Sequence, residues 1–147
     1  MSKEKILQLL NHALELEHSA HIQYLGHAEL IGGLEAEPII ARLKEIASDE
    51  LKHQAKFREL IGLLGGVPSL KMALAHPAKT MKEILVQNIK AEKEAIDTYK
   101  KILVELKKEK ANYYDLLLEH EIRHIAMEEQ EHLTELELLQ NTQGQSY

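Results

Sequence analysis

Cysteine and tryptophan are both absent from this chain of 147 residues, and aromatic residues make up only 4% of it. Without cysteine the chain forms no disulfide, zinc finger or thiolate iron–sulfur site, so any metal must bind to oxygen and nitrogen ligands. Glycine and proline are also scarce, with seven and three residues, and they cluster between long periodic segments. This combination predicts an all-helical protein.

Clustered positive charge is missing as well, because the net charge is −6 and the pI is about 5.8. A nucleic-acid surface needs gathered Lys and Arg, so we expect no nucleic-acid partner. No apolar run reaches the roughly 18 residues of a membrane span, and the N-terminus MSKEKILQLL lacks the apolar core of a signal peptide. We therefore expect a cytoplasmic protein with no membrane partner.

Four long segments carry apolar residues at helical spacing. Glycine pairs at 32–33 and 65–66 end the first two segments, and Thr80 with Glu83 forms a capping-box pattern before the third. Asn112 is the expected N-cap of the fourth. We predict helices over about 2–31, 38–64, 80–107 and 112–140.

The lengths of the connections predict how these helices are arranged. Two short turns and one long connection indicate two antiparallel hairpins. The long connection, residues 65–79, spans up to roughly 50 Å, more than the roughly 40 Å length of each helix. It can therefore cross over along the whole bundle. We predict one all-α four-helix domain over residues 1–140 and a polar C-terminal tail over 141–147.

Polar residues interrupt the apolar stripe of every predicted helix. In SDELKHQAKF (48–57), two stripe positions hold a glutamate and a histidine three residues later, and the fourth helix repeats this pattern. The first and third helices each place one glutamate in the stripe. These six residues, which we call the Glu/His cluster, are Glu17, Glu50, His53, Glu92, Glu129 and His132.

The four glutamates are predicted to lie at one depth in the bundle. Glu17 lies 17 residues before a turn centred at residue 34, and Glu50 lies 16 residues after it. Glu92 lies 18 residues before a turn centred at residue 110, and Glu129 lies 19 after it. A mismatch of one residue is about 1.5 Å of helix rise. Within each hairpin the two carboxylates should therefore lie side by side.

A weak internal repeat relates the two hairpins. EHSAHIQY (17–24) and EKEAIDTY (92–99) share E-x-x-A-x-x-x-Y, and the second and fourth helices share E-x-x-H. A single stripe glutamate usually reaches solvent, and one E-x-x-H is common on helix surfaces. Four unpaired carboxylates in a core, however, would cost several kcal/mol each. Two divalent metals balance four carboxylates and two neutral imidazoles, and these ligands suit iron or manganese.

At these residues the chain resembles the ferritin-like superfamily, and within it the bacterioferritins, over nearly its whole length, including LLGGVPSL (63–70). The resemblance implies a ferritin-like four-helix bundle with a two-iron centre. It implies that Glu50 and Glu129 bridge the metals. It also implies that Glu17 with His53, and Glu92 with His132, complete the two ends.

The resemblance further implies roles for residues around the centre. Tyr24 and Tyr99 match tyrosines that hydrogen-bond to the carboxylates. Asp49 matches an aspartate that orients a ligand histidine. Its counterpart in the other hairpin is Glu128, which is one methylene longer.

Three departures from the family pattern shape the expectations. Leu51 stands where bacterioferritins have the methionine that ligates haem, so we expect no haem. The chain stops too soon after Gln140 for the short fifth helix of the 24-subunit shell, so the formation of that shell stays open. We expect a homo-oligomer, at least a dimer. Ala95 stands where rubrerythrins carry an additional glutamate.

The remaining histidines carry weaker signals. Glu121 and His124 form another E-x-x-H, but about 12 Å along the helix from Glu129. His21 lies in the first stripe, where a core histidine is favoured over a role beside the metals. We expect the other five to lie on the surface, namely His12, His18, His27, His76 and His120.

The leading functional hypothesis is a ferroxidase that takes up two Fe(II), oxidises them with O2 or H2O2 and supports iron storage or detoxification. One alternative is a small di-metal oxidase (Fe or Mn/Fe) or a rubrerythrin-like peroxidase without a storage shell. That alternative needs a pocket beside the metals and an electron donor, and the sequence reveals neither. A bundle that binds metal without turnover is the third hypothesis.

Overall fold

The computed structural model describes residues 2–108 and 113–143. These residues form four long helices, one short 3-10 helix and the connections between them, and no strand occurs among them. The elements are α1 (Ser2–Ala28), η1 (Leu34–Ala36), α2 (Glu37–Leu63), α3 (Met81–Lys108) and α4 (Asp115–Gln143). The predicted all-α four-helix architecture is confirmed.

Helix ends in the first hairpin follow its glycines. α1 ends three residues before the predicted Ile31, because the backbone tightens where the N–H of Leu30 donates to the carbonyl of His27. α2 ends as predicted at a glycine pair. Gly65 has a φ of 77°, its N–H donates to Gly62 and the N–H of Gly66 donates to Ile61. These two bonds form a Schellman motif, which satisfies the last carbonyls of the helix.

The second hairpin differs more from the predicted boundaries. The hydroxyl of Thr80 accepts from the N–H of Glu83, as predicted, but the Glu83 carboxylate accepts from the N–H of Lys79 rather than from that of Thr80. α4 begins at Asp115 and continues to Gln143, beyond the predicted end at residue 140. The predicted N-cap Asn112 lies outside the described residues, as do residues 144–147 of the predicted tail.

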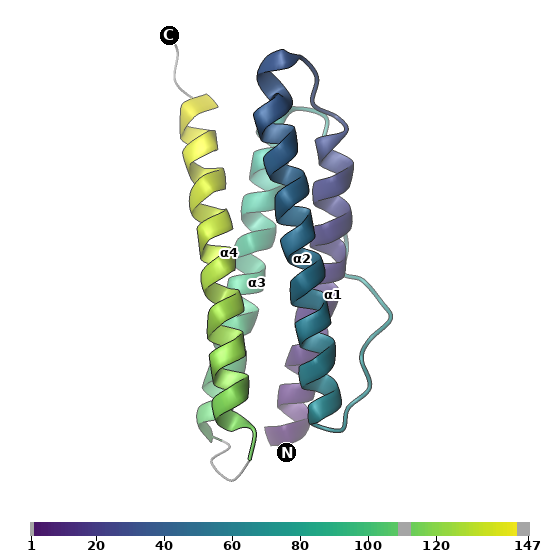
Figure 1. Cartoon of the computed structure of the whole chain (residues 1–147), viewed down its shortest axis with the longest axis vertical. Helices are drawn as coiled ribbons and strands as arrows, with labels where there is room; N and C mark the ends of the chain where they lie inside the picture. The colour runs from purple at the N-terminus through teal and green to yellow at the C-terminus, as the bar shows by residue number, and fades with distance from the viewer. Residues whose placement is uncertain (1, 109–112, 144–147) are drawn as a thin grey trace.

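The hairpins pair as the connection lengths predict. α1 packs on α2, α3 packs on α4, and α1 and α3 join the two hairpins, whereas α2 and α4 approach each other closely at few points (Figure 1). The long connection after α2 runs along α1. Asn11 donates to the carbonyl of Val67, and His27 bonds to the carbonyl of His76. The predicted crossover is therefore present.

Two apolar clusters fill the bundle, one towards each end. The cluster nearer the N-terminus of α1 contains Leu10, Phe57 and Ile102. The other contains Leu43, Leu85 and Leu136. A polar layer separates the two clusters at mid-height, and the candidate site lies in that layer.

Within the described part of the chain, no helix has both the length and the hydropathy that a membrane span requires.

Candidate metal centre

The structure brings all six residues of the Glu/His cluster together. Each of the six is at most 3% exposed to solvent, although each is polar or charged. One glutamate comes from each of α1 and α3, and a glutamate with a histidine three residues later comes from each of α2 and α4. Positions that interrupt the apolar stripes in the sequence thus meet in one buried layer.

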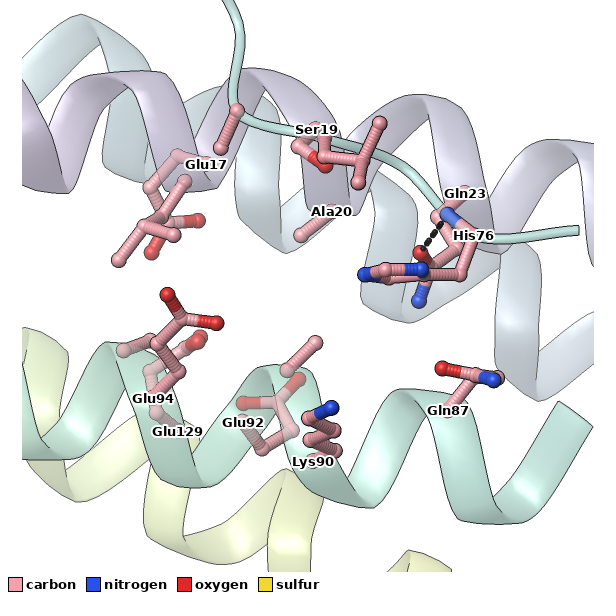
Figure 2. Close-up of a pocket in the computed structure, with 15 residues that line it drawn as sticks. Glu17, Ser19, Ala20, Gln23, His76, Gln87, Lys90, Glu92, Glu94 and Glu129 are labelled. Atoms are coloured by element: carbon pink, nitrogen blue, oxygen red, sulfur yellow. Dashed lines mark hydrogen bonds between the residues drawn. The ribbon is translucent and has the colours of Figure 1, made fainter.

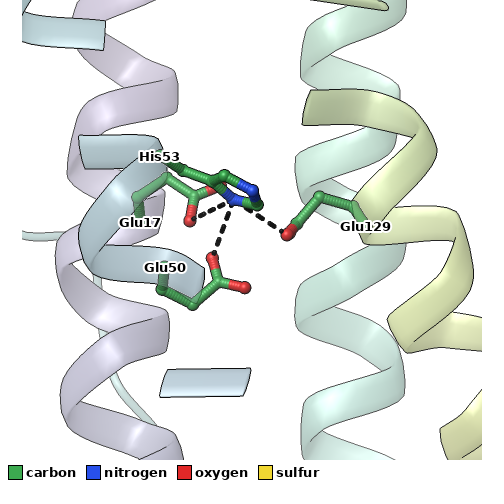
Figure 3. Close-up of side chains that lie close together, drawn as sticks. All are labelled: Glu17, Glu50, His53 and Glu129. Carbon is green, nitrogen blue, oxygen red and sulfur yellow. Dashed lines mark ion pairs between the residues drawn. The ribbon is translucent and has the colours of Figure 1, made fainter. Parts of the chain in front are cut away.

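His53 occupies one end of this layer (Figure 3). Its Nδ1 lies 3.1 Å from Glu129 Oε1, 3.5 Å from Glu17 Oε2 and 3.7 Å from Glu50 Oε2. The ring therefore directs one nitrogen at carboxylates from α1, α2 and α4.

His132 occupies the other end in the same manner. Its Nδ1 lies 3.3 Å from Glu129 Oε1, 3.4 Å from Glu50 Oε1 and 3.6 Å from Glu92 Oε1. The two imidazole rings are 6.4 Å apart between centroids. The cluster consequently has two ends, each with one histidine and one glutamate of its own.

Two glutamates belong to both ends. One group of potential ligand atoms, all within 4.8 Å of one another, comes from Glu17, Glu50, His53 and Glu129; a second comes from Glu50, Glu92, Glu129 and His132. Glu50 and Glu129 occur in both groups. This sharing gives the site the form of two adjacent cation positions with two common carboxylates.

Several buried polar atoms in the layer have no hydrogen-bond partner. They are Glu17 Oε2, both carboxylate oxygens of Glu50, Glu92 Oε2, Glu129 Oε1 and the Nδ1 atoms of His53 and His132. Leaving buried polar atoms unpaired is costly, and so many converging on one point indicate a missing cationic partner. The oxygen and nitrogen donors fit a pair of divalent iron or manganese ions.

The outer nitrogen of each histidine is held by a carboxylate from the opposite hairpin. His53 Nε2 lies 2.6 Å from Glu128 Oε2, and His132 Nε2 lies 2.9 Å from Asp49 Oδ2. Because a carboxylate accepts the Nε2 proton, the Nδ1 lone pair is directed into the layer. The contacts expected for Asp49 and Glu128 are present, and the longer Glu128 also reaches its histidine.

Both predicted tyrosines contact the layer. The hydroxyl of Tyr24 donates to Glu92 Oε1 at 2.7 Å, and that of Tyr99 donates to Glu17 Oε1. Each tyrosine comes from one hairpin and holds a glutamate of the other. Burial raises the pKa of both phenols well above their ordinary value, so both hydroxyls remain protonated donors.

Metal-free, the layer retains protons. Burial, together with the Glu129 carboxylate, raises the pKa of Glu92 to about 8. Burial alone would lower the pKa of His53, but the Glu129 and Glu50 carboxylates outweigh it and raise the pKa to about 11. The pKa of His132 is raised for the same reason, because the surrounding carboxylates outweigh the effect of burial. Metal binding at this site must therefore displace protons.

The histidines outside the Glu/His cluster differ in how far they agree with the sequence predictions. His27, expected on the surface, is 3% exposed; its ring bonds to Asn88 and to the backbone of His76. The crossover path creates this network, and no local pattern signals it. His21, expected in the core, is only half-buried; its Nδ1 bonds to the Ala47 carbonyl of α2. Glu121 with His124 forms no metal-ligand group within the described residues.

His124 instead contacts the support of the cluster. Its Nε2 lies 2.8 Å from Glu128 Oε1, while the other oxygen of that carboxylate holds His53. The side chain of His124 is 59% exposed, so Glu128 lies between a buried and a solvent-exposed imidazole. The spacing of His124 and Glu128, four residues apart on a helix, would have indicated this contact in the sequence.

A cavity reaches the layer from one side (Figure 2). It lies between α1, α3 and the crossover connection, and Glu17, Glu92 and Glu129 form part of its wall. Neither histidine of the cluster lines it. The centre is thus approached from the side of α1 and α3.

Comparison with known proteins places these features in a family. The chain matches the model of the ferritin-like domain over residues 7–144. It is also 29% identical over 133 residues to the bacterioferritin of Desulfovibrio desulfuricans, covering 90% of this chain and 72% of that protein.

Solved structures give the same result. A ferritin-like, diiron-carboxylate protein from Bacillus anthracis superposes with a TM-score of 0.87 at 26% identity, covering 95% of this chain and 98% of that one. Desulfovibrio desulfuricans bacterioferritin, described with its diiron site in different catalytic states, superposes with a TM-score of 0.85 at 27% identity, covering 95% and 80%. Rhodobacter capsulatus bacterioferritin shares the fold at 21% identity, with a TM-score of 0.82 and coverage of 95% and 85%.

Proposed function

This chain belongs to the ferritin-like domain family, and from that premise we propose that its Glu/His cluster binds two iron ions and oxidises Fe(II). The observation that carries the proposal is the set of unpaired buried atoms in the cluster, which come from all six residues. Glu50 and Glu129, which belong to both groups of potential ligand atoms, would be shared by the two ions. Glu17 with His53, and Glu92 with His132, would complete the two ends.

Charge supports this assignment. Two divalent ions carry +4, which offsets four carboxylates when both histidines are neutral. Asp49 and Glu128 keep each Nε2 protonated and each Nδ1 free to bind. Manganese suits the same ligand types, so metal analysis of the purified protein must decide between the ions.

Fe(II) is the substrate in this proposal. Two Fe(II) each give up one electron, and O2 takes up both electrons with two protons to form H2O2. When H2O2 is the oxidant, the same two electrons and two protons give two water molecules. The anionic carboxylates favour Fe(III), and the hydroxyls of Tyr24 and Tyr99 keep the Glu92 and Glu17 carboxylates in place during the change of charge.

The direct test mixes metal-free protein with Fe(II) in air and follows the absorbance of Fe(III). We expect rapid oxidation by the wild type and its loss in Glu50→Ala, because Glu50 belongs to both ligand groups. Glu59→Ala is the matched control, since the Glu59 side chain is 68% exposed on the same helix. Wild-type protein that oxidises iron no faster than buffer would rule the proposal out.

We further propose that the protein acts in the cytoplasm as a homo-oligomer that supports iron storage or detoxification. Leu51 is 48% exposed and has no atom that can ligate haem iron, so we propose a centre that works without haem. Size-exclusion chromatography combined with iron analysis tests the assembly. A hollow shell filled with iron supports storage, whereas a small oligomer with two ions per chain supports detoxification.

A further inference from the structure

The cavity beside the candidate metal centre extends beyond the residues of the Glu/His cluster. Its volume is about 140 Å³, and its lining extends from Glu92 and Glu129 to Gln87 and His76. Gln87 precedes Glu92 by five residues, which is about 7.5 Å along α3. Most of this length lies beyond the reach of a metal–ligand bond, so the cavity offers space for another molecule.

Small side chains keep the cavity open. Ala20 of α1 and Ala95 of α3 both line it, and these are the alanines shared by the two E-x-x-A-x-x-x-Y repeats. Ala91 lies one turn before Ala95 on the same wall. A leucine at any of these positions would project into the space. The open cavity therefore accounts for the alanine in both repeats, which metal binding by the glutamates does not explain.

The crossover connection closes the outer side (Figure 2). His76 lies on this wall, its N–H donates to the side-chain oxygen of Gln23 at 2.8 Å, and the amide of Gln23 donates to Asn88 at 3.0 Å. The outer wall is therefore tied to both α1 and α3.

The size of the cavity indicates what it can hold. An apolar protein cavity of about 150 Å³ binds benzene. O2 and H2O2, with two oxygen atoms each, need far less space. The cavity therefore fits a molecule of roughly six to eight non-hydrogen atoms, smaller than the ligands of typical drug-sized pockets.

The lining indicates the chemistry of that molecule. Ala20, Ala91 and Ala95 present methyl groups, and Ser19 and Gln87 present polar groups. Lys90 and Glu94, at exposed positions of the lining, add one charge of each sign. With two divalent ions bound, four carboxylates leave the inner end without net charge. An uncharged molecule with an apolar body and one hydroxyl suits such a lining.

We propose that this cavity binds a small neutral organic molecule of the size of phenol beside the metal centre. Its apolar body lies against the three alanines, and its hydroxyl reaches Ser19, Gln87 or the metal centre. Any role of this molecule in catalysis rests on the proposed function, because the proposed iron ligands Glu17, Glu92 and Glu129 form the inner end of the cavity. Binding itself depends only on the shape and lining of the cavity.

The test uses 4-fluorophenol as the probe and fluorine NMR as the measurement. We expect saturable binding of one molecule per chain to protein loaded with redox-inactive Zn(II), in which two divalent ions offset the four carboxylates. Ala20→Leu and Ala91→Leu should each weaken binding about tenfold or more, since even one methylene changes affinity in an apolar pocket by such factors. The zinc content should remain that of the wild type.

The two variants fill the cavity from opposite walls, so one suffices if the other does not fold. Ala41→Leu, on an exposed position of α2, is the control and should bind the probe like the wild type. Absence of saturable binding to zinc-loaded protein overturns the proposal, as does unchanged affinity in a folded cavity variant. Iron oxidation by a protein that does not bind the probe would leave the proposed function intact. Probe binding without iron oxidation would refute only the proposed function.

Discussion

Single residues of one hairpin hold the metal-site histidines of the other. Asp49 of α2 holds His132 of α4, and Glu128 of α4 holds His53 of α2. Such outer partners fix the orientation of a histidine ring and increase its basicity. The metal affinity of the proposed centre should therefore depend on residues outside the two groups of potential ligands.

Neutralising these partners should weaken metal binding. We expect Asp49→Asn and Glu128→Gln each to lower the affinity for Zn(II) by about 10- to 100-fold, measured by calorimetry. Glu131→Gln is the control, because Glu131 is exposed on α4 near Glu128. Equal affinities in all three variants would show that the two carboxylates do not position the histidines.

Tyr24 contributes to the stability of the metal-free protein. Tyr24→Phe removes the donor to a buried carboxylate oxygen of Glu92, and an unsatisfied buried group costs about 1–3 kcal/mol. We expect a loss of that order in the free energy of unfolding of the metal-free protein, measured with urea. Tyr113→Phe should cause no loss, since Tyr113 is 99% exposed. A loss of equal size in both variants would contradict this role for the Glu92 contact.

At the scale of helices and connections, the sequence predicted the features that follow from helical periodicity, namely the helices and the residues on their buried faces. The Glu/His cluster was found because its members occupy stripe positions at equal depth from two turns, and the structure brings them together as expected. The early end of α1 and the burial of His27 were not predicted. The helix ends where the N–H of Leu30 bonds to the carbonyl of His27. The burial of His27 depends on where the crossover lies against α1, and a one-dimensional pattern contains no information about that contact.

His27 provides a test of how the crossover is anchored. Burial lowers the pKa of His27, so its contribution to stability is present above its unfolded pKa of about 6.5 and is lost as the pH falls below that value. The neutral ring bonds to Asn88 on one side and to the carbonyl of His76 on the other.

We therefore expect unfolding free energy to fall less steeply between about pH 7.5 and 5 in His27→Gln than in the wild type, because glutamine has no proton to gain. Urea titrations of the metal-free proteins at several pH values measure the slope. His12→Gln, at an exposed position of α1, should retain the slope of the wild type. Parallel profiles for His27→Gln and the wild type would contradict the role of His27.

At the scale of the whole molecule, the polar layer divides the apolar core in two. One cluster contains Leu10 and Phe57, and the other contains Leu43 and Leu136. Between them lie four buried carboxylates that lack sufficient partners when no metal is bound. The bundle should consequently be more stable with the metal than without it.

Removal of metal tests this directly. A ligand at 100 times its Kd stabilises the folded state by about 2.7 kcal/mol, so we expect chelation to lower the melting temperature by several degrees. Scanning calorimetry with and without chelator measures the change. Glu50→Ala should show little response to chelator, and an equally large response would mean that the stabilising ions bind elsewhere.

The crossed contacts between hairpins also bear on how such a chain can originate. Each hairpin contributes two glutamates and one histidine, together with a tyrosine and a carboxylate that support residues of the other hairpin. Two copies of a single hairpin, related by a twofold axis, would supply the same six ligands and the same supports. Duplication and fusion of one helix pair would thus start from a complete site, and the two copies would afterwards be free to diverge at positions such as those of Asp49 and Glu128.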